Sequence, residues 1–512
     1  MLFTRLIRPF GRTLASASIV VFSAMGANRM PISDTLDGEF YYQAIYDNPR
    51  PAAYEWLKAR FRFPEIPVLK GLLCKVGHNS HDAVYDDKYW RLAKALDFGL
   101  VGFKFKDALY IDTYKGTASG FNDMMDSLAR STGHPEVKHI PRCFWGFSEG
   151  GACSFSINCS DPDIILAYYA AGATKGGRCN DEAVFNPGMV SLGETERDEH
   201  PEKNFTNMRE RNGRIAYAIQ WGAGHNWWAN THLVLPFLYQ VATDRLAGVT
   251  DFTSGPITLK RYAEEDGWLC DMSTWESNYA TIAPYESYTG DKTKASWVIN
   301  EYLAKVWQGF VSKDPPISIT ASFSFDDSIP EGDAVTLYAE YEGDGPPDLV
   351  RFLSGNQVLG TSDSAYYSQN SKYYYRLEGV VPSKGLHSLL AEADIGEQTV
   401  ISKPTTIFVE PPYGSGGGNA VETQYHSRTS GIKARLSRDA GGVVVEIPRY
   451  AKSPTSVAVI DSRGRRIAAS AVFRTAPGRS VTLPLEGCAR GVLFICVTTP
   501  EEPTKTIRIV SP

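Results

Sequence analysis

Ser148 lies at the centre of the pentapeptide Gly146–Gly150, which has the pattern G-x-S-x-G. The apolar run Cys143–Trp145 precedes this pentapeptide, and the small residues Gly150–Ala152 follow it. A strand that turns sharply into a helix holds the residue at the corner in a strained conformation, and glycines two positions before and after it avoid clashes there. The pattern therefore predicts a nucleophilic serine at a turn between a strand and a helix.

The residue types that activate a serine follow later in the chain. An acidic loop at 193–198 comes after the apolar segment 189–192, and His225 comes after the apolar segment 215–221. A serine hydroxyl is a poor nucleophile at neutral pH, so a histidine takes its proton and a carboxylate orients that histidine. The order serine, acid, histidine is that of α/β-hydrolases, whereas chymotrypsin and subtilisin use other orders.

The segments around Ser148 alternate between two periodicities. The stretches with strand character are 67–76, 99–105 and 142–147, and those with helical character are 89–98 and 120–132. Strands that alternate with helices of about a dozen residues predict a parallel sheet covered on both faces. The expected fold class is therefore α/β, with a doubly wound, mostly parallel sheet.

Two backbone N–H groups are candidates to bind the oxyanion that forms during acyl transfer. The first belongs to Glu149, directly after the serine, and the second to the turn at His78 and Asn79, which follows the strand 67–76. Such a pair supplies about 3 kcal/mol of transition-state stabilisation. A plain polar turn is the alternative for residues 78–79.

Residues 40–310 resemble secreted esterases of the α/β-hydrolase class, similar to feruloyl esterases, acetyl-xylan esterases and polyester depolymerases. The resemblance rests on the pentapeptide 146–150, the acid loop 193–196 and the turn 222–225. It implies ester hydrolysis through an acyl-enzyme and leaves the ester open.

The position of the acid in such hydrolases, about three residues after the glycine that ends the strand, favours Glu196. Asp198 has the commoner residue type and is the alternative, and Glu194 is a third candidate.

Composition excludes several other classes of function. The net charge is −6 and the isoelectric point is near 5.9, whereas nucleic-acid binding requires a basic face. Neither a C-x-x-C pair nor an H-E-x-x-H motif occurs, so no metal or other cofactor is expected. Among the eight cysteines, Cys159 with Cys179 and Cys488 with Cys496 are candidate disulfides.

The N-terminal segment 1–27 has the pattern of a secretory signal peptide. Arg5, Arg8 and Arg12 precede the apolar run 14–24, and small residues follow at 26–27. A run of this length is too short to span a bilayer, whose hydrocarbon core is about 30 Å thick. The sequence therefore predicts an extracellular or cell-surface protein without a stable membrane span.

Composition changes after the catalytic segment 28–312. Short alternating strands are expected at 313–410, which resemble the Ig-like β-sandwich modules of secreted enzymes, and a Gly-rich linker follows at 411–420. A second all-β domain is expected at 421–512; it resembles the sorting domain of type IX secretion and would then bind secretion machinery. A carbohydrate-associated β module is the alternative for that domain.

Tryptophans near the predicted triad are candidates to bind the substrate, namely Trp145, Trp221, Trp227 and Trp228. They predict short or aromatic acyl esters, and the appended β domains favour a polymeric substrate such as a plant polysaccharide or a polyester. For Trp145, packing in the core is an equal alternative. A lipase or a serine peptidase of the same fold is a further alternative, and a non-catalytic binding protein on a hydrolase scaffold is the alternative of another class.

Overall fold

The computed structural model describes residues 58–77, 80–103, 121–174, 179–196, 199–225, 231–277, 279–322 and 328–411 with their side chains. It describes the backbone alone for segments 32–33, 41–47, 56–57, 104–105 and 117–120, and for strands between 425 and 511. The signal peptide predicted at 1–27 and residues 412–420 of the predicted linker lie outside the described residues.

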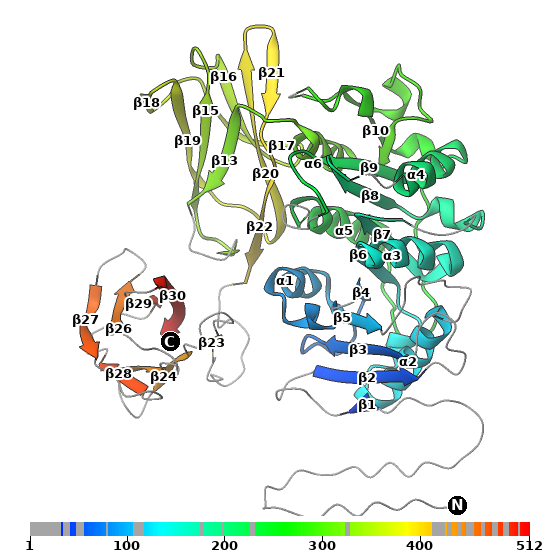
Figure 1. The fold of residues 1–512 in the computed structure, drawn as a ribbon, viewed down its shortest axis with the longest axis horizontal. Helices are drawn as coiled ribbons and strands as arrows, with labels where there is room; N and C mark the ends of the chain where they lie inside the picture. The colour runs from blue at the N-terminus through cyan, green and yellow to red at the C-terminus, as the bar shows by residue number, and fades with distance from the viewer. Residues whose placement is uncertain are drawn as a thin grey trace, which may run out of the picture. The chain divides into compact units, whose positions relative to one another are not determined.

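The N-terminal part of the chain forms a nine-stranded mixed sheet with six parallel strands (Figure 1). Parallel pairing joins β5 to β4 and continues through β6, β7 and β8 to β9. In spatial order the strands are β1 (Ile32–Ser33), β2 (Tyr41–Asp47), β3 (Trp56–Arg62), β5 (Phe98–Phe105), β4 (Gly71–Val76), β6 (Arg142–Phe147), β7 (Ile165–Ala171), β8 (Gly188–Gly193) and β9 (Ile215–Gln220).

One edge of this sheet is antiparallel, which the sequence patterns did not predict. Strands β1, β2 and β3 pair antiparallel with one another, and β3 pairs antiparallel with β5. The segment between β2 and β3 spans only residues 48–55, which is shorter than a parallel crossover through a helix requires. These two strands can therefore be neighbours only in antiparallel orientation.

Helices cover both faces of the sheet. They are α1 (Asp87–Leu96), α2 (Thr117–Thr132), α3 (Glu149–Ser160), α4 (His200–Glu210), α5 (Thr231–Arg245) and α6 (Glu301–Val311). Consecutive strand residues point to opposite faces. Phe144 accordingly shares a buried cluster with residues of α2, α3 and α4, whereas Trp145 packs against Tyr89 of α1. On that second face Tyr169 packs against Phe237 of α5.

The direction of the chain connections changes at β4. From β4 the chain passes through α1 to β5 on one side, and from β5 it passes through α2 to β6 on the other side. At such a switch point the flanking loops diverge, so ligands of open α/β sheets bind outside the carboxyl ends of the strands there. The turn after β4 and the turn after β6 both lie at this place.

The segment after α5 forms a buttress on the edge strand β9. It contains a small sheet of β11 (Ile282–Pro284), β10 (Trp268–Cys270) and β12 (Ser296–Val298). The hydroxyl of Ser296 accepts from the N–H of Tyr217 and donates to its carbonyl oxygen, at 2.8 and 3.0 Å. The indole N–H of Trp307 donates to the same carbonyl oxygen at 2.7 Å. These bonds satisfy backbone groups on the edge of β9, the last strand in the order of its sheet.

Two further sheets follow α6 (Figure 1). In β15 the residues at 335, 337, 339 and 341 are buried and those between them are more exposed, as the alternation of the sequence predicts. One sheet has the order β13 (Ile317–Ala321), β15 (Val335–Glu342), β19 (Lys372–Val380), β18 (Tyr367–Gln369). The other has the order β14 (Ser328–Pro330), β22 (Thr405–Glu410), β20 (Gly385–Ile395), β16 (Leu349–Ser354), β17 (Gln357–Ser362), and β21 (Gln398–Ile401) pairs with β20.

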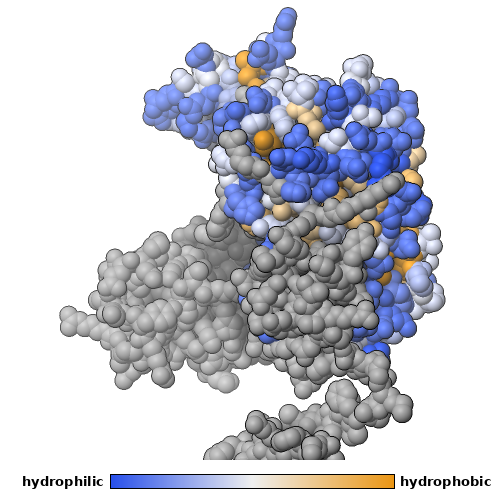
Figure 2. All heavy atoms as spheres, turned by 45° about the vertical axis from the view of Figure 1, so that its right-hand side comes forward, coloured by the Kyte–Doolittle hydropathy of each residue, from blue (hydrophilic) through white to orange (hydrophobic). Residues whose placement is uncertain are grey.

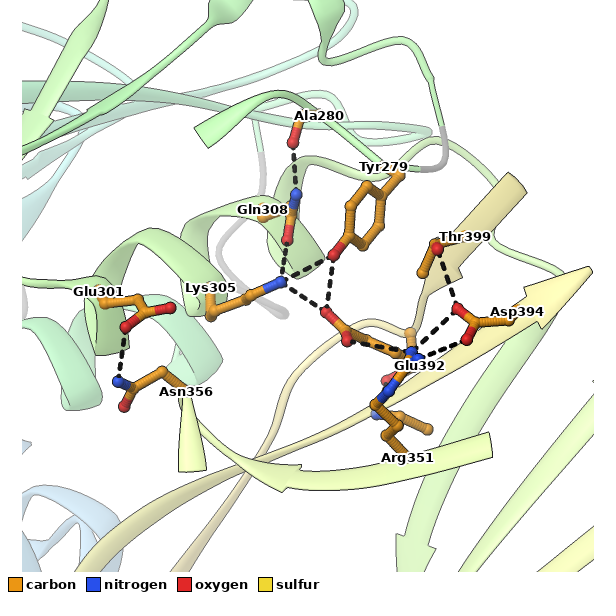
Figure 3. Close-up of polar contacts among 12 residues, drawn as sticks. Tyr279, Ala280, Glu301, Lys305, Gln308, Arg351, Asn356, Glu392, Asp394 and Thr399 are labelled. Carbon is orange, nitrogen blue, oxygen red and sulfur yellow. Dashed lines mark hydrogen bonds and ion pairs between the residues drawn. The ribbon is translucent and has the colours of Figure 1, made fainter. Parts of the chain in front are cut away.

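A partly buried polar network joins this all-β region to the α/β region (Figure 3). Lys305 of α6 contacts the carboxylate of Glu392 in β20 at 2.6 Å, the hydroxyl of Tyr279 at 2.8 Å and the amide oxygen of Gln308 at 3.2 Å. Burial alone would lower the pKa of Lys305, but Glu392 and Tyr279 raise it above its ordinary value. Arg351 lies beside Glu392 and pairs with Asp394.

The C-terminal strands form two antiparallel sheets of four strands each. One contains β23 (Tyr425–His426), β24 (Lys433–Ser437), β25 (Gly442–Glu446) and β28 (Ser480–Pro484). The other contains β27 (Arg466–Phe473), β26 (Thr455–Asp461), β29 (Gly491–Thr499) and β30 (Glu502–Ser511). The all-β class predicted for 421–512 agrees with this arrangement.

The described surface is mainly polar on the face that Figure 2 shows. Figure 2 shows mainly hydrophilic residues on the face in view, with hydrophobic residues in small separate groups. The large hydrophobic side chains with the highest exposure are Tyr338, Val358, Tyr366, Tyr367 and Val381. Within the described residues, no helix combines the length and the apolar composition that crossing a bilayer requires.

Candidate active site

Ser148 occupies the sharp turn between β6 and α3. Its backbone has φ 59° and ψ −124°, and its N–H donates to the carbonyl oxygen of Ala171 at 2.8 Å. A non-glycine residue with positive φ stores about 1 to 3 kcal/mol of strain, which the surrounding structure must hold. This conformation places the serine at the corner, as the pentapeptide predicts.

The two flanking glycines are required by the close approach of the backbone. A Cβ on Gly146 would lie 2.2 Å from the carbonyl carbon of Gly150, and a Cβ on Gly150 would lie 2.0 Å from the carbonyl oxygen of Val76. Because all of these neighbours are backbone atoms, no rotamer change could relieve the clash. The G-x-S-x-G pattern is thus a packing requirement of the elbow against the end of β4.

Glu196 and His225 are in direct contact. His225 Nδ1 hydrogen-bonds to Oε1 of Glu196, and the second carboxylate oxygen accepts the N–H of Gly193 at 2.6 Å. A carboxylate only accepts hydrogen bonds, so the proton of the neutral imidazole lies on Nδ1 and Nε2 is the basic nitrogen. The Glu196 side chain is 6% exposed and that of His225 is 51% exposed. A buried carboxylate thus orients a solvent-accessible base.

The loops that carry these two residues are bonded to each other. Strands β8 and β9 are parallel neighbours, so their carboxyl ends lie side by side. Beyond them, the N–H of Thr195 donates to the carbonyl oxygen of Ala223 at 3.1 Å. A Cβ on Gly193 would lie 2.3 Å from the carbonyl oxygen of Gly224, so the loops also pack without space for a side chain there.

His225 lies next to the elbow. Its ring centroid is 4.4 Å from that of Phe147, the residue before Ser148. A Cβ on Gly172, directly after β7, would lie 3.1 Å from Cε1 of His225. The serine, the acid and the histidine therefore lie at the same end of the parallel strands, beyond the carboxyl ends of β6, β7, β8 and β9. Sequence reasoning missed Phe147 and Gly172, although both adjoin predicted strand ends.

The candidate oxyanion donors lie only partly within the described residues. Glu149 is the first residue of α3, so its backbone N–H belongs to the positive end of that helix. The end of β4 touches the same helix turn, because a Cβ on Gly77 would lie 3.9 Å from Cα of Gly150. His78 and Asn79, the predicted second donor site, lie outside the described residues.

The tryptophans require one correction. Trp145 is fully buried, and its ring centroid lies 4.3 Å from that of Tyr89. A side chain on the helix-covered face of a central strand cannot reach a substrate, so Trp145 is a core residue and not a binding residue. The indole N–H of Trp221 donates to the carbonyl oxygen of Val311 at 2.5 Å. Trp227, Trp228 and the alternative acid Asp198 lie outside the described residues.

Among the cysteines whose side chains are described, one pair forms a disulfide and four are buried thiols. Cys159 at the end of α3 pairs with Cys179 in the loop after β7, which confirms that candidate pair. Burial raises the pKa of the Cys143 thiol to about 12 and also raises those of Cys74, Cys153 and Cys270, which disfavours reactive thiolates. The side chains of Cys488 and Cys496 lie outside the described residues.

Among the described residues, no His, Cys, Asp or Glu residues form a group of three that could hold a metal ion.

Comparison with known proteins finds similarity to solved structures only. No protein-family description and no curated protein matches the sequence. An S-formylglutathione hydrolase from Staphylococcus aureus is 11% identical, with 40% of this chain and 96% of that chain covered and a TM-score of 0.30. A ferulic acid esterase is 13% identical, with 40% and 100% covered and a TM-score of 0.29. Fibronectin(III)-like modules of Clostridium thermocellum CbhA are 18% identical, with 18% and 93% covered and a TM-score of 0.15.

Proposed function

We propose that this protein is a serine hydrolase that cleaves carboxylic esters through an acyl-enzyme. The observation that carries the proposal is the strained Ser148 at the end of β6 together with the Glu196–His225 pair at the ends of β8 and β9. A strained serine at a sharp turn and a histidine oriented by a carboxylate are the parts that nucleophilic acyl transfer requires.

In this mechanism His225 Nε2 takes the proton of the Ser148 hydroxyl while Oγ attacks the ester carbonyl. The carboxylate of Glu196 stabilises the imidazolium that forms, and it keeps the proton on Nδ1 beforehand. The N–H of Glu149 and a second donor from the turn 78–79 bind the oxyanion. The imidazolium then protonates the leaving alcohol, and a water activated by the same histidine releases the acid.

Contacts support Glu196 as the acid. The carboxylate of Glu196 touches Nδ1 of His225 directly, whereas the carboxylate of Glu194 accepts the N–H of Gly222 instead. Glu196 is also the better buried, with a side-chain exposure of 6% against 37% for Glu194. A charge has a stronger effect on its partner where water is excluded.

The proposed substrates are short or aromatic acyl esters, on a small molecule or on a polymer such as a plant polysaccharide or a polyester. Trp227 and Trp228 directly follow the His225 turn in sequence and supply aromatic surface for such groups. The basic and apolar pattern of residues 1–27 supports export of the protein, and residues 421–512 are proposed to act as its type IX sorting domain.

The test is esterase activity together with active-site labelling. The purified protein is expected to hydrolyse p-nitrophenyl acetate and to react with a fluorophosphonate, and Ser148→Ala is expected to do neither.

A panel of acetylated xylan, methyl ferulate, triglyceride and polyester film then ranks the substrates. Preference for long-chain triglyceride would favour a lipase, and peptide cleavage a peptidase. A folded protein that shows neither turnover nor labelling would be a binding protein on this scaffold.

A further inference from the structure

Glu194 lies two residues before the proposed acid and binds the loop that carries His225. Its Oε2 accepts the backbone N–H of Gly222 at 2.9 Å. Gly222 is a turn residue with φ +69°, a conformation that glycine adopts at little cost. The bond therefore fixes the turn from which the chain continues to His225.

The same turn is tied to the end of α6. The indole N–H of Trp221 donates to the carbonyl oxygen of Val311, the last residue of that helix. Nζ of Lys313 lies 4.5 Å from the centroid of the Trp221 ring and 3.8 Å from Oε1 of Glu194. Glu194, Lys313, Trp221 and Gly222 thus form one polar cluster, which we call the turn anchor.

The turn anchor matters because few of the described residues pack against His225. Half of its side chain is exposed, and its described contacts are the Glu196 carboxylate, the Phe147 ring and the backbone at Gly172. The position of Nε2 relative to Ser148 therefore depends on where the loop backbone lies. A displacement of about 1 Å costs about 100-fold in rate when a reacting group is misplaced.

We infer that Glu194 is a positioning residue: through Gly222 it holds the turn that places His225, and Lys313 holds its carboxylate beside the end of α6. The consequence for rate rests on the proposed function, whereas the anchoring of the turn does not. Glu194 and Glu196 thus have separate roles, because Glu196 touches the imidazole and Glu194 touches the backbone that carries it.

The kinetic test compares three variants. Glu194→Ala removes the acceptor for Gly222 and is expected to lower kcat about 10- to 100-fold, with KM changed less than about twofold. In Glu194→Gln an amide oxygen can still accept the same N–H, so kcat is expected to stay within about threefold of the parent. Glu340→Ala is the matched control, because the Glu340–Lys372 pair has the same side-chain exposures, 37% and 38%, and lies in the all-β region. It is expected to leave kcat unchanged.

A double-mutant cycle shows whether Glu194 acts through the proposed pair. In the Glu196→Gln background, Glu194→Ala is expected to add less than about a twofold loss, because residues that act as one unit are not additive. A full multiplicative loss would overturn the positioning role, and so would equal losses in Glu194→Ala and Glu194→Gln.

Amide hydrogen exchange tests the anchor without reference to ester turnover. Glu194→Ala is expected to speed exchange of the Gly222 N–H at least about tenfold, since its acceptor is lost, while Glu194→Gln and Glu340→Ala preserve the protection. Unchanged exchange in Glu194→Ala would overturn the inference. If the variants show this exchange pattern but the parent protein hydrolyses no ester, the proposed function fails and the anchoring of the turn stands.

Discussion

Glu196 and Glu392 are two of the buried carboxylates that face basic groups in the described part of the chain, and their partners differ in exposure. The Glu196 side chain is 6% exposed and that of Glu392 is 7% exposed. Their partners, His225 and Lys305, are 51% and 14% exposed. The carboxylate is therefore buried to nearly the same degree at the candidate active site and at the junction with the all-β region. The two places differ in the exposure of the basic side chain.

The difference shows how one interaction serves chemistry in one place and structure in another. Lys305 can donate three hydrogen bonds, and Glu392, Tyr279 and Gln308 accept all three. His225 shares one ring nitrogen with Glu196 and retains a second nitrogen that can exchange protons. A fully satisfied cation fixes a junction, whereas a half-satisfied, exposed base can act on a substrate.

The largest expected effect comes from removing the exposed base. His225→Ala is expected to lower kcat on p-nitrophenyl acetate about 10⁴-fold or more, because the serine loses its proton acceptor. The urea midpoint of unfolding is expected to fall only slightly, because the N–H of Gly193 still donates to the Glu196 carboxylate. A loss of less than tenfold with an unchanged fold would remove His225 from the mechanism.

Neutralising the buried acid is expected to come next. Glu196→Gln should lower kcat about 10³- to 10⁴-fold, because the amide no longer stabilises the imidazolium or enforces its tautomer. Steady-state kinetics checks the loss, and circular dichroism checks the fold. If Asp198→Asn causes the larger loss instead, Asp198 is the acid.

The matching change at the junction should affect stability and not chemistry. Glu392→Gln leaves the buried ammonium of Lys305 without its carboxylate and is expected to lower the free energy of unfolding by about 3 kcal/mol. Urea unfolding measures this loss, and kcat at 25 °C is expected to stay within about twofold. A large loss of kcat in a folded protein would mean that the two carboxylates are not separate in role.

Removing both charges of the Lys305–Glu392 pair tests whether the pair itself is needed for stability. Lys305→Met with Glu392→Leu is expected to recover the stability lost in Glu392→Gln to within about 1 kcal/mol of the parent, because apolar replacements of similar size avoid the desolvation of a buried pair. The double variant is compared with both single variants by urea unfolding. A double variant less stable than either single one would show that the network specifies the fold of the junction.

The smallest effect is expected from deleting the C-terminal β domain. A chain that ends at Glu410 keeps β22 and the junction network and is expected to retain the kcat of the full chain on a small soluble ester. Export from the native host is expected to fail. If small-ester activity survives while activity on a polymer falls, the domain binds substrate and does not sort the protein. Abolished turnover in a folded truncated chain would contradict the domain division.

Sequence alone determined the features that depend on neighbouring residues. The pentapeptide around Ser148 indicated the elbow, because a Cβ on Gly146 would meet the backbone of Gly150 within the same turn of chain. Alternation of strands and helices indicated the mostly parallel sheet, because each βαβ step is local. The residues at 335 to 341 indicated a half-buried strand through their period of two.

Only the tertiary structure decided how distant segments meet. Glu194 and Glu196 differ by two positions in sequence, and bonds to the loop after β9 join Glu196 to His225 and Glu194 to Gly222. Trp145 has the residue type of a binding group, yet the helix α1 covers its face of the sheet. The reason is common to both cases: residue type and spacing fix what a side chain can do, whereas its partners come from other segments, and their positions are set by packing of the whole chain.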